Sequence, residues 1–181
     1  MFSNGTITSV DKYLALHTCD TVRLVDSDEL HEKIISASVI HIFGAGLNPE
    51  KPAHTAVKEL SDRGWAIAPI HPRDAGATIN GFPIRPKLDS GIVAEIVVLF
   101  LAPERAREVV RSLIINHSPD DFPLIWFQHG AEDEDSFCAL DELGANYVAN
   151  DCIVVNSNEN DLKCANSVSY THLRAHETLN H

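Results

Sequence analysis

The sequence predicts an α/β protein of the Rossmann-like, doubly wound class, with a mainly parallel five-stranded sheet and helices on both of its faces. Strand-like and helix-like patterns alternate along the chain with short connections, which is typical of parallel strands joined by helices. The expected strands are apolar throughout, as strands covered on both faces are. A chain of 181 residues with 44% hydrophobic residues is also long enough to bury one sizeable core.

The first half of the chain supplies two helices and two strands. A helix is expected over residues 26–37, where Asp28 and Glu29 favour the positive end of the helix dipole. The β-branched run SVIHIF, residues 38–43, predicts a buried strand. A helix with proline in its first turn follows from Pro52 to a glycine stop at Gly64, and WAIAPI, residues 65–70, predicts the next strand.

The second half repeats the pattern after a turn-rich stretch. Residues 73–92 have little regular character, apart from one short extended piece at 81–84. The remaining elements are expected in the order strand 95–101, helix 103–114, strand 123–128 and helix 132–144, whose first turn is acidic. The runs NYVAN, residues 146–150, and CIVV, residues 152–155, are interpreted as a fifth strand or a pair of strands.

Charge and hydropathy exclude two classes of partner. With 26 acidic and 14 basic residues the net charge is -12, which repels nucleic acid and anionic lipid surfaces. A single anionic ligand remains compatible with this charge, because local donors can override it. The sequence lacks a signal-peptide pattern and an apolar stretch of the roughly 20 residues that a membrane helix needs. We therefore expect a cytoplasmic protein. The sequence does not indicate a protein partner.

The two ends of the chain differ from its centre. Residues 1–25 are weakly patterned and are expected to form an N-terminal extension to a domain spanning residues 26–160. Residues 161–181 are expected to be a tail. Within it, VSYTHLRAHET, residues 168–178, resembles the translation of an adapter used in sequencing libraries. Residues 167–181 and their three histidines are therefore not expected to contribute to the function.

A glycine turn directly after the first strand is the strongest candidate for a ligand site. In Gly44-Ala45-Gly46 the missing side chains permit a tight turn and let main-chain N–H groups approach an anion. The helix that begins near Pro52 points its positive end at the same place, and Lys51 adds a cation. Together these features predict a diphosphate-binding loop.

The dinucleotide-binding fingerprint is incomplete here. Pro49 stands where the third glycine of GxGxxG is expected. The second strand ends in Pro69-Ile70-His71-Pro72, and the acid that would hold a ribose, Asp74, comes only beyond Arg73. Arg73 instead suits a phosphate on the ribose, so an NAD(P)-dependent oxidoreductase stays open as an alternative.

Six segments in register carry a family resemblance. GAGLNPEKPAH, residues 44–54, resembles the GASxNPxRPS loop of small CoA-binding proteins, which are related to the CoA-binding domain of succinyl-CoA synthetase α subunits. Five further segments, taken in chain order, are similar to motifs of the same family: residues 64–72, 81–84, 97–104, 125–130 and 150–153. The resemblance spans roughly residues 28–155, and it implies a Rossmann-like sheet that binds coenzyme A or an acyl-CoA.

The resemblance also implies roles for individual residues. Gly44, Ala45, Gly46 and Asn48 would line the diphosphate of CoA, and Lys51 or Arg73 would meet its 3′-phosphate. Pro52, at the start of the helix, is also expected among the cofactor-binding residues. Pro69, His71 and Pro72 would flank the adenosine. The groove would be walled by Leu99, Phe100 and Leu101.

The sequence departs from the family pattern at three of these places, and each departure removes or alters a polar contact. Leu101 or its neighbour replaces an arginine, Ala53 a serine, and His71 an asparagine. A module that has lost its ligand is therefore a second alternative. The sequence shows no catalytic Ser/His/Asp set, no paired carboxylates and no metal-binding spacing, so we expect binding without catalysis and without a metal.

Overall fold

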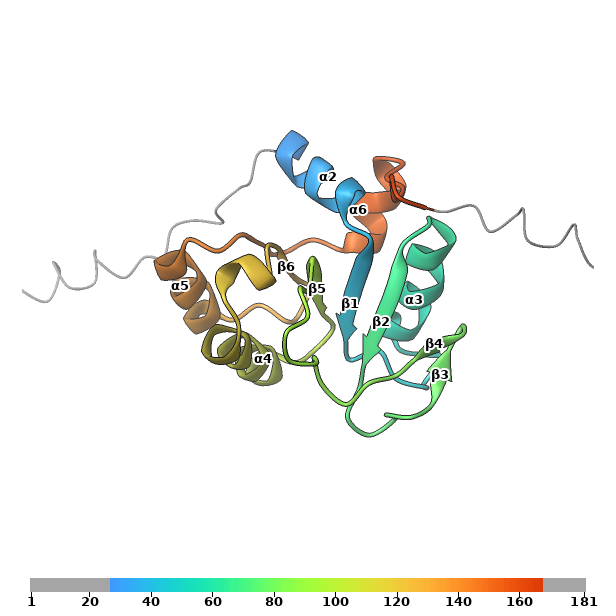
Figure 1. Ribbon diagram of the computed structural model, residues 1–181, viewed down its shortest axis with the longest axis horizontal. Coiled ribbons are helices and arrows are strands. Elements are labelled where there is room, and N and C mark those ends of the chain that lie inside the picture. Colours follow the sequence, from blue (N-terminus) through green and yellow to red (C-terminus); the bar gives the residue numbers. More distant parts are fainter. Residues whose placement is uncertain (1–26, 168–181) are drawn as a thin grey trace, which may run out of the picture.

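The computed structural model describes residues 27–167 and confirms the predicted α/β class (Figure 1). Five parallel strands form the sheet in the order β2-β1-β5-β6-β7. Their bounds are Val39–Phe43 for β1, Ala66–Ile70 for β2, Ile96–Leu99 for β5, Ile125–Phe127 for β6 and Tyr147–Val148 for β7. The second strand along the chain lies outside the first, so the direction of winding reverses between β1 and β5.

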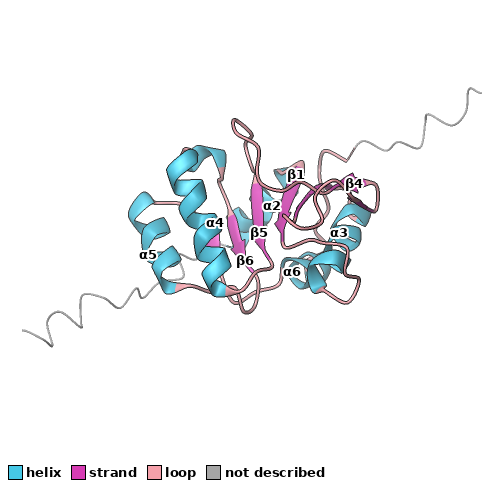
Figure 2. Ribbon diagram, turned by 90° about the horizontal axis from the view of Figure 1, so that it is seen from below, coloured by secondary structure: helices cyan, strands magenta, loops and turns pink. Residues whose placement is uncertain are grey.

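Helices cover both faces of the sheet, as expected. Figure 2 shows α3 (Pro52–Asp62) and α6 (Ile153–Glu159) on one side, with α4 (Pro103–Asn116) and α5 (Glu134–Leu143) on the other. The helix α2 (Ser27–Ser36) contributes Ile34 to the core on the α3 side. A 3-10 turn, Pro119–Asp121, precedes β6. The β3–β4 hairpin (Thr78–Ile79 and Phe82–Pro83) lies beside β2 in Figure 1.

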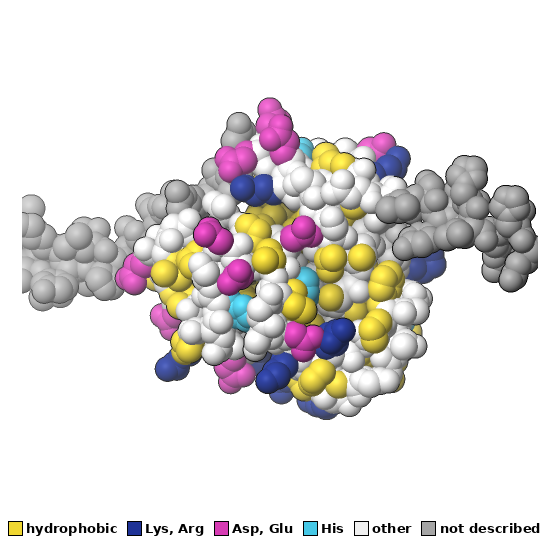
Figure 3. Space-filling model, in the orientation of Figure 1, with side chains coloured by type: hydrophobic (Ala, Val, Ile, Leu, Met, Phe, Trp, Pro, Cys, Tyr) yellow, Lys and Arg dark blue, Asp and Glu magenta, His cyan; other side chains and the backbone are white. Residues whose placement is uncertain are grey.

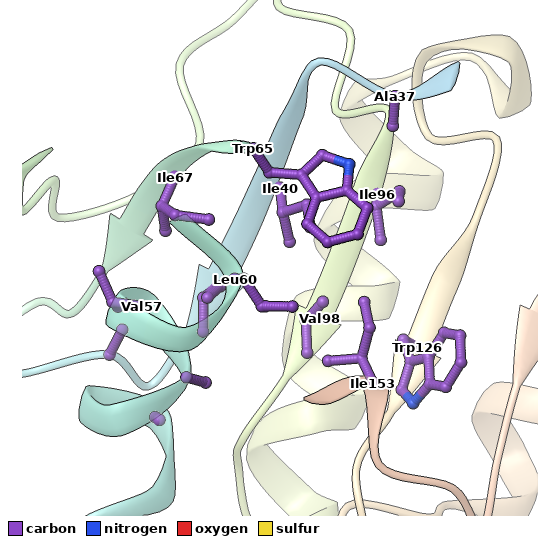
Figure 4. Close-up of a cluster of buried hydrophobic side chains, with 14 of the residues drawn as sticks. Ala37, Ile40, Val57, Leu60, Trp65, Ile67, Ile96, Val98, Trp126 and Ile153 are labelled. Carbon is purple, nitrogen blue, oxygen red and sulfur yellow. The ribbon is translucent and has the colours of Figure 1, made fainter. Parts of the chain in front are cut away.

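Successive side chains of each strand enter two different cores. In β5, Ile96 and Val98 join the core on the α3 side, whereas Val97 and Leu99 join the core on the α4 side. This alternation follows from the period of two residues in a strand. Trp65 and Trp126 are the largest side chains of the core on the α3 side (Figure 4). Both faces of the sheet are therefore packed, which leaves the loops at the strand ends as the places where a ligand can bind.

The prediction that CIVV forms strand is wrong: these residues begin the helix α6. Ile153 is fully buried in the same core as Trp126, and Figure 4 shows the two side chains near one another. The indole N–H of Trp126 donates to the Asp151 carbonyl at 3.0 Å and fixes the chain just before the helix. A four-residue apolar run has no clear period, so tertiary packing decides its conformation.

The extended piece predicted at residues 81–84 is one arm of the β3–β4 hairpin. Asn80 and Gly81 both have positive φ, 49° and 85°, which is the backbone of a tight hairpin turn. The isolated bridge between Ile70 and Arg85 then returns the chain to the end of β2. The turn-rich stretch therefore folds back over the carboxyl ends of the strands.

Packing continues past α6. Leu162 and Cys164 are buried in the core on the α3 side, and the Cys164 N–H donates to the Arg63 carbonyl. The predictions for residues 1–25 and for the adapter-like segment fall almost wholly on residues 1–26 and 168–181, outside the described part. None of the helices between residues 27 and 167 has the length and apolar character that crossing a membrane requires.

Candidate functional site

The predicted glycine loop leaves β1 at the point where the sheet reverses its winding. Parallel α/β sheets bind their ligands beyond the carboxyl ends of the strands at this point. The loop connects Phe43 to α3, whose first residue is Pro52. The segments that follow β2, β5 and β6 begin at the same edge of the sheet, which is the lower edge in Figure 1.

Gly44 is required by its conformation and by its neighbours. Its φ is 92°, a region that residues with a side chain rarely adopt. Its N–H donates to the Ile70 carbonyl at 2.9 Å, and the adjacent Phe43 carbonyl accepts from the Phe100 N–H at 3.0 Å. A Cβ at position 44 would run into the Phe100 carbonyl. Gly44 therefore lets the loop cross directly over the ends of β2 and β5.

The second glycine of the loop has a different role. Gly46 does not have a positive φ, but a Cβ there would collide with the Asp74 carboxylate and meet the His71 ring at 3.0 Å. Asp74 Oδ2 accepts a hydrogen bond from the Leu47 N–H at 2.8 Å and lies 3.3 Å from His71 Nδ1. Gly46 thus makes room for a carboxylate that belongs to the protein itself.

The loop retains unused hydrogen-bond donors. Within residues 27–167, the main-chain N–H groups of Ala45, Gly46, Asn48 and Ala53 have no hydrogen-bond partner. Free N–H groups at the start of a helix, together with the helix dipole, attract an anion. These donors fit the diphosphate of a nucleotide.

A cleft of about 860 Å³ opens at this edge of the sheet. That volume lies within the range usual for sites that hold a small molecule. Its walls come from the ends of β1 and β2, the start of α3, residues 86–90, the length of α4 and the loop after β6. The apolar part of the lining includes Phe43, Ile70, Leu88, Val109 and Leu113. The cleft is therefore polar and charged at some places and apolar at others.

Basic residues are concentrated at this cleft without acidic partners. Eleven of the chain's Lys and Arg residues lie within residues 27–167. Six of them pair with a carboxylate: Lys33, Lys58, Arg63, Arg85, Arg107 and Lys163. Five have no ion-pair partner in the described part, and four of these line the cleft: Lys51, Arg73, Lys87 and Arg105. In Figure 3 several Lys and Arg side chains lie along the lower edge, where β1 and β2 end in Figure 1.

The structure brings most of the predicted site residues to the cleft. Eight of the thirteen line it: Gly44, Lys51, Pro52, His71, Pro72, Arg73, Phe100 and Leu101. Ala45, Gly46, Asn48 and Pro69 are not part of its lining. Leu99 is wrong as a wall residue, because its side chain is 0% exposed and packs in the core on the α4 side. The strand alternation directs Leu99 into the sheet, and the groove wall begins with Phe100.

Four residues at this edge were not included in the predicted site. Lys87 lies in the turn-rich stretch, and the sequence does not show how that stretch folds. Arg105 is a polar residue of α4, and its sequence position does not indicate that it faces the cleft. Gln128 directly follows β6. It lines the cleft while 4% exposed, and its Nε2 has no partner among the described residues. Asp74 looked too far from the strand end to act there.

An ion-pair cluster secures the loop after β6, which forms one wall of the cleft. Asp133 caps α5 by accepting from the Ser136 N–H at 2.8 Å and from its hydroxyl at 2.7 Å. Arg107 of α4 donates to the same carboxylate through Nε at 2.9 Å. Chiefly through the Arg107 hydrogen bond, the pKa of Asp133 lies below its usual value of 3.8. The two helices are thereby joined at the rim of the cleft.

Comparison of the sequence with known protein families identifies the family of this chain. Residues 38–158 match the family described as the CoA binding domain, which is two thirds of the chain. The chain belongs to this family. The resemblance inferred from six short segments is thus confirmed, and the matched range includes the glycine loop and the whole sheet.

Two solved structures and one curated protein are similar to this chain. A conserved hypothetical protein from Pyrococcus furiosus superposes with a TM-score of 0.57 at 25% identity, covering 66% of this chain and 99% of that one. A hypothetical protein from Pyrococcus horikoshii gives a TM-score of 0.67 at 24% identity, covering 76% and 94%. The Bacillus subtilis protein YneT is 25% identical over 128 residues, which is 70% of this chain and 90% of YneT. Their names describe no enzymatic activity.

Proposed function

We propose that this protein binds coenzyme A or an acyl-CoA in the cleft at the carboxyl edge of its sheet, without catalysis of its own. The observation that carries the proposal is the set of four basic side chains at the cleft that have no acidic partner within residues 27–167. In a chain of net charge -12, unpaired cations around a hollow are best explained by an anionic ligand. Membership of the CoA binding domain family supports the same ligand.

The chemistry of CoA matches the parts of the site. Its diphosphate fits the free N–H groups of the glycine loop and the start of α3. Its 3′-phosphate fits Lys51 or Arg73, which both line the cleft. The apolar lining between α4 and residues 86–90 suits the less polar pantetheine arm. The proposal includes Pro69, His71 and Pro72 beside the adenosine, as the family resemblance implies.

Calorimetric titration of the full chain tests this proposal. CoA, dephospho-CoA, NADH and NADPH are titrated in parallel at one fixed ionic strength. We expect CoA to bind most tightly and dephospho-CoA to bind about tenfold more weakly, because one charged hydrogen bond contributes about 1.5–3 kcal/mol. Binding of NADPH without binding of CoA would instead support the oxidoreductase alternative. Absence of binding by all four ligands would support a module without a ligand.

Single substitutions then test whether the unpaired cations are responsible. Lys51→Gln and Arg73→Gln are compared with Lys58→Gln, because Lys58 of α3 pairs with Asp62 and lies outside the cleft lining. We expect about a tenfold loss of CoA affinity for at least one of the first two and less than a twofold change for Lys58→Gln. The variant that has lost the 3′-phosphate contact no longer distinguishes CoA from dephospho-CoA. Equal effects at all three positions would show only a general charge effect.

A further inference from the structure

We infer that the Asp74 carboxylate occupies the phosphate position of the glycine loop and competes with the ligand, which makes Asp74 the residue that limits affinity for CoA. This inference rests on the proposed function and concerns the same site. It is carried by the position of Asp74 against Gly46 and Leu47. The residue comes from the turn after β2, 27 positions further along the chain from Leu47.

The contacts of Asp74 are those that a phosphate oxygen would make. Its Oδ2 accepts from the Leu47 N–H at 2.8 Å and lies where a Cβ of residue 46 would point. The missing side chain of Gly46 is the feature that admits an anion to a loop of this kind. Here the space is filled by an anion of the protein, held 3.3 Å from His71 Nδ1.

The shape of the cleft agrees with this interpretation. Gly44 and Lys51 line it on either side of the loop, whereas residues 45–50 do not. The His71 ring and the Asp74 carboxylate are the side-chain groups nearest to the missing Cβ of Gly46. The Leu47 N–H, and the space beside Gly46, therefore become available to a ligand only when the Asp74 side chain turns away.

Charge makes the competition stronger than steric exclusion alone. A diphosphate at the loop would bring negative oxygens close to the Asp74 carboxylate, and like charges at such distances repel strongly away from bulk water. Asp74 is partly exposed and packs no apolar core, so its side chain is free to rotate toward solvent. The cations at Lys51 and Arg73 would then face the ligand without an internal competitor.

Two variants separate the charge of Asp74 from its bulk. Asp74→Asn keeps an oxygen that accepts from Leu47 but removes the charge, whereas Asp74→Ala removes both. Glu59→Gln is the matched control, because it removes one negative charge from α3 at a residue that does not line the cleft. Each full-length protein is titrated calorimetrically with CoA and, separately, with inorganic pyrophosphate, which has no adenosine.

We expect CoA affinity to rise in the order wild type, Asp74→Asn, Asp74→Ala. The total gain is at least tenfold, which corresponds to about 1.4 kcal/mol. Pyrophosphate follows the same order, and Glu59→Gln changes either affinity by less than threefold. Binding of CoA by the two Asp74 variants but not by the wild type supports the inference equally.

Two other outcomes overturn the inference and are distinguishable from each other. If the wild type binds CoA and the Asp74 variants bind it equally or more weakly, Asp74 is a supporting residue of the loop, and the proposed function stands. If neither the wild type nor the variants bind CoA or pyrophosphate, the proposed function and the inference both fail.

Discussion

Replacing Gly44 with alanine tests the geometry from which the site is built. The residue has a φ of 92°, and a left-handed conformation costs a residue with a side chain about 1–2 kcal/mol. The added Cβ also meets the Phe100 carbonyl, a main-chain group at the end of a central strand. Overpacking against atoms that cannot move away costs about 1–3 kcal/mol. We therefore expect Gly44→Ala to lower the free energy of unfolding by about 3 kcal/mol.

Gly46→Ala is the matched control for this prediction. Gly46 lies two residues further along the same loop but has no positive φ. Its new Cβ would meet the ends of two side chains, Asp74 and His71, and the carboxylate of Asp74 is free to rotate away. We expect a loss of stability below about 1 kcal/mol.

Urea denaturation followed by circular dichroism measures both variants against the wild type. The difference in unfolding free energy is obtained from the midpoints if the slopes agree. A Gly44→Ala protein as stable as Gly46→Ala would refute the reasoning, because the strain and the main-chain collision are present only at position 44.

Two further predictions concern buried ionisable groups. His41 is 5% exposed, and burial lowers its pKa from 6.5, so the folded state disfavours the protonated ring. The free energy of unfolding should therefore fall as the pH drops below about 6.5, where the unfolded chain gains a proton on His41. We expect the midpoint of urea denaturation to fall between about pH 7 and pH 5 in the wild type, and to fall less in His41→Gln. Asp133→Ala removes a helix cap and the acceptor of a buried Ser136 hydroxyl, and we expect a loss of about 3 kcal/mol. Asp135→Ala is the control, because the contact of Asp135 with Arg107 is exposed; thermal unfolding should show a loss of stability below about 1 kcal/mol for this variant. Equal losses of stability for the two aspartate variants would contradict the role given to Asp133. A pH profile that His41→Gln leaves unchanged would contradict the role given to His41.

The order of strands and helices could be predicted because each element has its own local signal. The apolar strand residues 96–99 and the proline-started helix at Pro52 are visible without knowledge of the rest of the chain. The segment from Ile153 is different, because a short apolar run fits a strand or a buried helix equally well. Its conformation is set by packing near Trp126, which is distant in the sequence.

The candidate site could be predicted where its residues directly follow a strand or begin a helix, as Gly44 and Lys51 do. A glycine after a strand has a direct meaning for backbone geometry. The role of Asp74 could not be predicted, because the sequence does not show that the turn after β2 folds back onto Leu47. Lys87 and Arg105 lie on different elements, and only the fold brings them to one cleft.

A crystal structure of the full chain with bound CoA tests the central claim most directly. We predict that the diphosphate accepts hydrogen bonds from the main chain of the glycine loop and that the 3′-phosphate lies beside Lys51 or Arg73. The Asp74 side chain should be turned away from Leu47. CoA bound at the opposite edge of the sheet, where the strands begin, would contradict the account.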